Sequence, residues 1–308
     1  MFAISEENRN GLRLFQLTNL EAEEYVCILP DAGCALNNFV INAKGNRLDL
    51  IDGYKDQKDL NDTIEKFFKG HFLFPFPNRI YGGTYLFEGK SFWLNQNFPH
   101  EKNAIHGMVY DQKFFLKHSS ASERSASASF EKIISGEFEG YPFHSLIRLT
   151  FTYFQRNLKV DSEIVNTGEG RMPVGIGWHP YFRIGSAVDG LKLKIPGGAQ
   201  WDEETKKYNP SDIISGKEPI GNQFIDHCFK KNNPAPVSLS DENKGITLYL
   251  DGEEDFSYFQ VFTPAHRKSI AIEPMTCVPD SFNNKEGLKV LEKKEPWLTS
   301  WSLKISES

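Results

Sequence analysis

Alternation of apolar and polar residues with a period of two is the feature that most limits how this chain can fold. Near the end of the chain, Trp297, Thr299, Trp301, Leu303 and Ile305 would all lie on one face of an extended segment. The same type of pattern predicts further strands at 12–17, 25–29, 34–41, 145–155, 158–166, 245–251, 256–263 and 269–273. The segment Pro30–Gly33 predicts a turn between the second and third of these strands.

Helical patterns are scarce. The clearest is Asp62–Lys69, where Asp62 can cap the helix, Glu65 can complete a capping box and Gly70 can end it. The polar stretches 119–129 and 230–243 are interpreted as loops or turns. Many strands, long loops and very little helix predict an all-β fold with an antiparallel sandwich. We expect a single domain over residues 1–308, because the chain shows no repeat or low-complexity linker.

Charge and composition argue against several classes of partner. The net charge of −6 provides no broad basic field for a nucleic-acid backbone. No apolar run approaches the roughly 20 residues that cross a bilayer, and the N-terminus lacks the apolar stretch of a signal peptide. The cysteines Cys27, Cys34, Cys228 and Cys277 are scattered without zinc-type spacing, which favours reduced, buried thiols. We therefore expect a cytoplasmic protein without nucleic-acid or membrane partners, metal or cofactor.

Two polar segments in the first half of the chain are candidates for a binding site. In Phe74–Gly83 the prolines hold the backbone extended, and Asn78 beside Arg79 offers donors and acceptors that suit neighbouring sugar hydroxyls. The alternative is a loop arginine in a surface ion pair. His106 precedes Gly107, which allows close approach of backbone or ligand. A structural, hydrogen-bonded histidine is the alternative interpretation of His106.

Three further residues lie in the second half. His179 stands between Trp178 and Tyr181, a composition compatible with either a sugar site or an aromatic core. Glu273 is placed at the end of an apolar strand, where burial would oppose its charge. Asp226 could accept hydrogen bonds from sugar hydroxyls, or simply cap a turn.

Together these segments resemble the aldose 1-epimerase (galactose mutarotase-like) family. Residues 77–85 followed by 105–107 are similar to its Asn-Arg-Ile … His-Gly block. The runs 165–168, 172–174 and 179–182 resemble a second block. Ile272-Glu273, with Pro279-Asp280 and Asn283 downstream, resembles a third. The likeness spans about residues 30 to 285. The Pro-Met-Thr-Cys segment after Glu273 and the proline before Asn78 depart from the galactose enzymes, so the chain resembles a divergent branch and the sugar stays open.

The resemblance implies a large antiparallel β-supersandwich and a monosaccharide substrate. It implies that Glu273 is the general base and His179 the general acid, with His106 as a second active-site histidine. It also implies that Arg79, Asn78 and Asp226 bind the sugar. Anomer interconversion then follows if Glu273 takes the C1 hydroxyl proton while His179, as imidazolium, protonates the ring oxygen. This needs no metal or cofactor.

Three alternatives remain open at this point. A carbohydrate-binding or sugar-sensing protein would keep the fold without the reaction. A hexose-phosphate mutarotase would require extra cations, for which Arg183 is the nearby candidate. A glycoside hydrolase would use Glu273 and Asp226 as its two carboxylates, which leaves the histidines unexplained. The oligomeric state is not indicated by the sequence.

Overall fold

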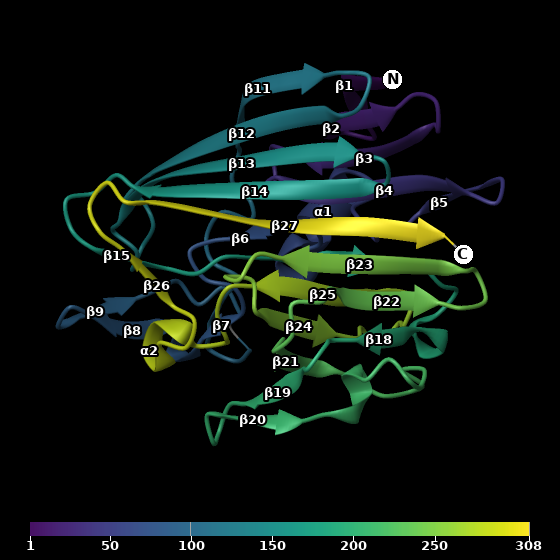
Figure 1. The fold of residues 1–308 in the computed structure, drawn as a ribbon. Helices are drawn as coiled ribbons and strands as arrows, with labels where there is room; N and C mark the ends of the chain where they lie inside the picture. Colours follow the sequence, from purple (N-terminus) through teal and green to yellow (C-terminus); the bar gives the residue numbers. More distant parts are fainter. Residues whose placement is uncertain (99, 308) are drawn as a thin grey trace.

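The computed structural model describes residues 1–98 and 100–307. Strand accounts for 51% of the residues and helix for 8%, which confirms the predicted all-β fold. The ladders between the described strands are antiparallel, and the strands are arranged mainly in three sheets (Figure 1).

The first sheet is an N-terminal meander of five strands. In spatial order these are β1 (Phe2–Arg9), β2 (Leu12–Asn19), β3 (Glu24–Leu29), β4 (Ala35–Ala43) and β5 (Asn46–Asp49). The second, here called the large sheet, has eight strands. They are β11 (Phe115–Ala121), β12 (Ala126–Ser135), β13 (His144–Phe154), β14 (Asn157–Asn166), β27 (Pro296–Glu307), β23 (Ile246–Gly252), β22 (Val237–Asp241) and β18 (Lys192–Lys194).

The third, here called the short-stranded sheet, lies behind and below the large sheet in Figure 1. It runs β20 (Lys207–Pro210), β19 (Ala199–Asp202), β21 (Asp226–Lys230), β24 (Tyr258–Phe262), β25 (Ile270–Met275), β16 (Gly177–Trp178) and β6 (Phe72–Leu73), and β17 (Tyr181–Phe182) also pairs with β25. Three two-stranded ladders complete the fold: β7 (Arg79–Ile80) with β10 (Ala104–Ile105), β8 (Thr84–Phe87) with β9 (Lys90–Trp93), and β15 (Met172–Val174) with β26 (Lys289–Leu291).

The two larger sheets pack face to face through aromatic side chains. Trp178 of the short-stranded sheet contacts Trp301 of the large sheet, with ring centroids 5.6 Å apart, and contacts Phe151 at 5.5 Å. The predicted face of β27 is the buried one, since Trp297, Thr299, Trp301, Leu303 and Ile305 are each at most 5% exposed. Burial of these large rings is the main favourable contribution to joining the sheets.

The predicted strands are confirmed, with ends shifted by a few residues, but three other predictions are wrong. The predicted loop 119–129 is largely strand, in β11 and β12. The stretch 230–243 contains β22. Helix α1 spans Gln57–Phe67 rather than Asp62–Lys69, because its cap is Asp56, whose side chain accepts from the Asp59 N–H. A second, one-turn helix α2 (Ser281–Asn284) was not predicted.

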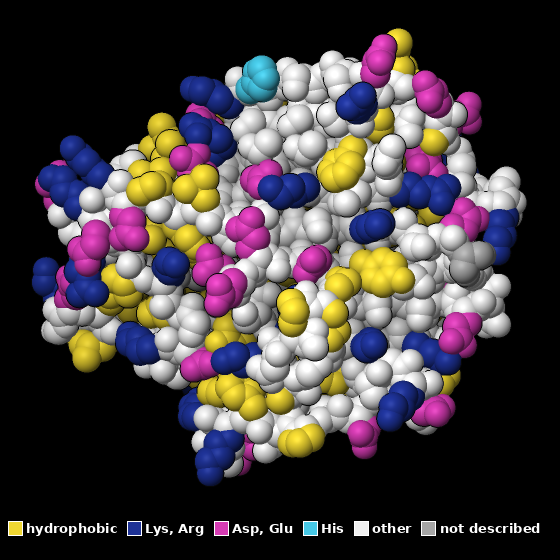
Figure 2. Space-filling model, in the orientation of Figure 1, with side chains coloured by type: hydrophobic (Ala, Val, Ile, Leu, Met, Phe, Trp, Pro, Cys, Tyr) yellow, Lys and Arg dark blue, Asp and Glu magenta, His cyan; other side chains and the backbone are white. Residues whose placement is uncertain are grey.

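The surface charges and the buried cysteines are as the sequence predicts. Figure 2 shows positive and negative side chains interspersed over the face of the large sheet, with scattered apolar ones between them. Cys27, Cys34, Cys228 and Cys277 are free and buried, as predicted. Among the described residues, no helix is both long enough and apolar enough to span a membrane.

Candidate active site

One pocket, of about 210 Å³, brings together all six residues singled out from the sequence. It lies between the central strands β21, β24 and β25 of the short-stranded sheet, the β7–β10 ladder and the C-terminal end of α1. The six are Asn78, Arg79, His106, His179, Asp226 and Glu273. Segments separated by nearly 200 residues in the chain therefore form one concave site, with a volume that suits a small molecule rather than a drug-sized ligand.

The centre of the pocket is a close pair formed by His179 and Glu273. His179 Nε2 lies 3.3 Å from Glu273 Oε1, and the two residues are 5% and 1% exposed. His179 directly follows β16, in which Trp178 is turned into the core, so alternation turns the imidazole to the pocket side. Its ring stacks on Tyr181, at a centroid distance of 5.1 Å. Glu273 sits inside β25, which is buried on both faces, rather than at the strand end that the sequence indicated.

Burial sets the protonation state of this pair. It lowers the pKa of His179 to about 3, and it raises the pKa of Glu273 well above its usual range. The nearby charge of Asp226 raises the pKa of Glu273 further, while Arg79 opposes the rise. Burial therefore favours the neutral form of both groups, with the proton of the pair on Glu273 and His179 as neutral imidazole rather than the expected imidazolium.

His106 is held in one tautomer by the backbone. Its Nδ1 accepts a hydrogen bond from the Asn78 N–H at 3.2 Å, so in the neutral ring the proton lies on Nε2. The residue adopts φ +58° and its ring packs on Phe68, 4.7 Å between centroids. Gly107 follows at φ +73°, where a Cβ would lie 2.0 Å from the Phe74 carbonyl oxygen. Close backbone packing thus requires a glycine directly after His106.

The two histidines and the glutamate of the pocket could in principle bind a metal ion. The ligand atoms of His106, His179 and Glu273 lie within 4.8 Å of one another, and two histidines with one carboxylate are a familiar metal-binding set. However, the tautomer of His106 is the wrong one, because a metal-bound histidine normally donates from its second nitrogen to a carbonyl or carboxylate. Here that nitrogen accepts from Asn78 instead. The arrangement suits donation from His106 Nε2 to a ligand oxygen.

The polar rim of the pocket is organised around Arg79. Its Nε donates to Glu101 Oε2 at 2.8 Å, its Nη1 donates to Asn78 Oδ1 at 3.3 Å, and its Nη2 lies 4.0 Å from Asp226 Oδ2. Asp226 also accepts a hydrogen bond of 2.7 Å from Gln260 Nε2. Charged donors and acceptors fixed by one another in this way are suited to several neighbouring hydroxyl groups.

Several polar atoms of the pocket lack a protein partner. Among the described residues, Glu273 Oε2, Gln260 Oε1 and His179 Nδ1 are buried without a hydrogen bond. All three residues line the pocket. An unpaired buried polar group costs about 1–3 kcal/mol, so a cluster of such groups is explained more readily by a polar ligand than by stability.

Sequence reasoning missed Gln260 and Phe68, which also line the pocket. Gln260 faces Glu273 in the ladder of β24 and β25. A single glutamine in the apolar run Tyr258–Phe262 was the available signal. Phe68, the left-handed residue that ends α1, contacts both histidine rings, and no sequence pattern marked it. Arg183, the candidate phosphate ligand, does not line the pocket and lies 3.9 Å from Asp52.

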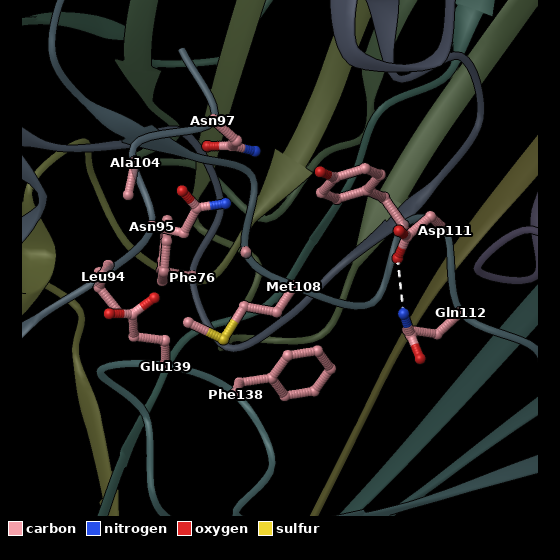
Figure 3. A pocket seen from close by; sticks show the side chains of 12 residues that line it. Phe76, Leu94, Asn95, Asn97, Ala104, Met108, Asp111, Gln112, Phe138 and Glu139 are labelled. Atoms are coloured by element: carbon pink, nitrogen blue, oxygen red, sulfur yellow. Dashed lines mark hydrogen bonds between the residues drawn. The ribbon is translucent and has the colours of Figure 1, made fainter. Parts of the chain in front are cut away.

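A second hollow, of about 160 Å³, lies against the same loop as His106 and is lined in part by Ala104, Met108 and Phe138 (Figure 3). None of the six predicted residues lines it. Asn97, on its wall, binds the backbone of Ile105 through both side-chain atoms, at 2.8 and 3.0 Å. Asn97 therefore holds the backbone directly before His106 in place.

Comparison with known proteins agrees with this architecture. The chain is 26% identical to the uncharacterised protein YihR of Escherichia coli, over 74% of this chain and 76% of that one. It is 22% identical to YphB of the same organism, over 76% and 82%. Its fold is similar to that of a galactose mutarotase-like protein from Clostridium acetobutylicum, with a TM-score of 0.87, 19% identity, and coverage of 100% of this chain and 99% of that chain.

A galactose 1-epimerase from Lactobacillus acidophilus gives a TM-score of 0.74 at 15% identity, with coverage of 100% of this chain and 99% of that one. The family model for aldose 1-epimerase matches residues 16–304. By its sequence as well as its fold, the chain belongs to the aldose 1-epimerase family.

Proposed function

We propose that the protein is an aldose 1-epimerase that interconverts the α and β anomers of a hexose. The observation that carries the proposal is the 3.3 Å contact between His179 and Glu273 inside a pocket of unpaired polar atoms. Opening a hemiacetal requires a base at the C1 hydroxyl and an acid at the ring oxygen. A carboxylate and an imidazole that share one proton can fill both roles.

His179 and Glu273 can supply and accept every proton that the reaction cycle moves. Transfer of the shared proton from Glu273 to His179 produces a carboxylate and an imidazolium. Glu273 then takes the C1 hydroxyl proton while His179 gives its proton to the ring oxygen, which opens the ring and returns the pair to its resting state. Rotation about C1–C2 exposes the other face of the aldehyde, and the reverse transfers close the ring. Each positioned transfer contributes roughly 10²–10⁴-fold.

The remaining residues act on charge and orientation. His106 donates from Nε2 to the ring oxygen or a neighbouring hydroxyl, and Arg79 stabilises negative charge that develops on the sugar. Asn78, Asp226 and Gln260 hold the other hydroxyls, which fixes the ring between acid and base. The carboxylates Glu101 and Asp226 near Arg79 disfavour a phosphorylated sugar, because they already surround the main cation of the pocket.

Polarimetry of freshly dissolved sugar tests the proposal. We expect the protein to accelerate the optical-rotation change of α-glucose or α-galactose in proportion to its concentration. The control is the Glu123→Gln variant, which changes an exposed glutamate that does not line the pocket and should leave the rate unchanged. Sugar binding, measured by calorimetry, without any acceleration would instead support a carbohydrate-binding protein.

A further inference from the structure

The backbone of His179 is held by a short segment that follows helix α1. We call this segment, from Phe68 to His71, the strap. The Gly70 N–H donates to the His179 carbonyl oxygen at 2.8 Å, and the His179 N–H donates to the His71 carbonyl oxygen at 3.1 Å. The strap also carries Phe68, whose ring lies 4.7 Å from that of His106 and 6.4 Å from that of His179, measured between centroids. The position of the strap therefore sets the position of the proposed acid.

The strap is fixed by the hydroxyl of a buried tyrosine that lies outside the pocket. Tyr54, in the loop between β5 and α1, is 3% exposed and does not line the pocket. Its Oη accepts a hydrogen bond of 3.0 Å from the Lys69 N–H and lies 2.9 Å from Nε2 of His71. A single oxygen atom thus binds two residues of the strap.

The direction of the second hydrogen bond follows from the first. Because burial raises the pKa of Tyr54, its hydroxyl keeps its one proton. The Lys69 N–H already donates to Oη, so the hydroxyl proton is directed at Nε2 of His71. Burial, followed by the charge of His179, lowers the pKa of His71 to about 3, which leaves Nε2 free to accept. Tyr54 and His71 therefore form a neutral donor–acceptor pair behind the active-site histidines.

Tyr54 is itself anchored at both of its backbone groups. Its N–H donates to Asn37 Oδ1 at 2.7 Å, and its carbonyl oxygen accepts from Asn37 Nδ2 at 3.1 Å. Asn37 belongs to β4 and is 1% exposed. The strap packs against the same strand, because a Cβ on Gly70, at φ +74°, would lie 2.2 Å from the Leu36 carbonyl oxygen. A continuous set of contacts thus runs from the N-terminal sheet through Tyr54 to His179.

We propose that Tyr54 is a positioning residue for His179: its hydroxyl fixes the strap, and the strap holds the imidazole at Glu273. This inference rests on the proposed function, because it assumes that His179 transfers a proton to the sugar. Displacement of a reacting group by about 1 Å can cost about 10²-fold in rate. Tyr54 does not line the pocket, so loss of its hydroxyl should slow turnover and leave sugar binding nearly unchanged.

The kinetic test is the Tyr54→Phe variant, which removes the hydroxyl and keeps the ring. In polarimetry with a hexose that the wild type accelerates, kcat should fall at least about fivefold, while KM changes less than about twofold. The matched control is Tyr85→Phe. Tyr85 is also 3% exposed and donates to the Gly140 carbonyl oxygen at 2.7 Å, but it lies outside the pocket and the strap. This control should keep its kcat, whatever stability it loses.

Amide hydrogen exchange tests the positioning without any sugar. The amides of Lys69 and His179 should exchange at least about threefold faster in Tyr54→Phe than in wild type, with no such change in Tyr85→Phe. An unchanged kcat in Tyr54→Phe, an equal fall of kcat in both variants, or unchanged exchange of the two amides would overturn the inference and leave the proposed function intact. Absence of mutarotation by the wild type would overturn the proposed function, and the catalytic role of Tyr54 with it.

Discussion

The imidazole of His179 and the carboxyl of Glu273 approach to 3.3 Å, while both side chains are almost fully buried. Burial disfavours the charged form of each, so the pair shares one proton across a wide range of pH. In the proposed mechanism, this neutral pair becomes an acid and a base by a single proton transfer from Glu273 to His179.

The pH dependence of kcat/KM should lack the acid-side fall of an ordinary histidine, because the pKa of His179 is lowered to about 3. In the proposed mechanism, activity requires the singly protonated pair, which forms when His179 loses its proton, near pH 3, and persists until Glu273 loses its own at its raised pKa. The rate should therefore not fall as the pH is lowered from 7 to 5, in polarimetric assays corrected for the buffer rate. A loss of activity centred near pH 6.5 would indicate an ordinary imidazole and would contradict this prediction.

The pH dependence of the melting temperature should show whether Glu273 is protonated in the folded protein. The pKa of Glu273 is raised in the folded state. Its stabilising contribution to folding is therefore present below the unfolded pKa of about 4.5, and it is lost as the pH rises through the folded-state pKa. The amide introduced by the Glu273→Gln substitution does not titrate. The melting temperature of Glu273→Gln minus that of wild type should thus be near zero at pH 4.5 and positive at pH 8. Calorimetry that shows a constant or falling difference would refute the assignment.

The close approach at Gly107 allows a matched stability test. Gly107→Ala places a Cβ 2.0 Å from the Phe74 carbonyl oxygen at φ +73°, so we expect a loss of about 3 kcal/mol or more in the free energy of unfolding. Gly89→Ala has nearly the same φ, +75°, with nothing within 4 Å, and should cost about 1 kcal/mol. Similar costs for the two variants in urea unfolding would show that the backbone does not pack as described.

Arg79 should affect binding in a way that lysine cannot reproduce. Arg79→Lys keeps the charge but removes the fork that reaches Glu101 and Asn78, so KM for the hexose should rise about tenfold or more. Arg183→Lys is the matched control, because Arg183 lies beside Asp52 outside the pocket. If Arg183→Lys raised KM as much as Arg79→Lys, the site would be wrongly placed.

Most strands of the fold could be predicted from the sequence, because burial of one face leaves an alternating pattern of apolar and polar residues. In β27 and in β13, alternation separates a buried from an exposed face, so the pattern is visible in the sequence. The alternation pattern does not reveal β12, which begins with a serine-rich run. Its serine hydroxyls pair with threonine hydroxyls of the neighbouring strand, Ser127 with Thr152 and Ser129 with Thr150. A polar run whose partners lie far along the chain is indistinguishable from a loop.

Some residues of the candidate site could be identified from the sequence, and others could not. Motif residues such as Asn78, His106 and Glu273 were identifiable because their neighbours are distinctive in the sequence. Gln260 was not, since its place in the pocket arises from the register that sets it opposite Glu273. The protonation state of His179 was also beyond the sequence, because it depends on how completely the fold excludes water from the ring.

The most direct test of the central claim is the mutarotation rate of Glu273→Gln. The substitution keeps the shape of the side chain and removes the proton acceptor, so kcat should fall by at least about 10² and approach the buffer rate. Folding is checked by far-UV circular dichroism, and Glu123→Gln serves as the matched control. Polarimetry at the buffer rate for Glu273→Gln, with full activity of Glu123→Gln, is the predicted result; a wild-type rate in Glu273→Gln would contradict the account.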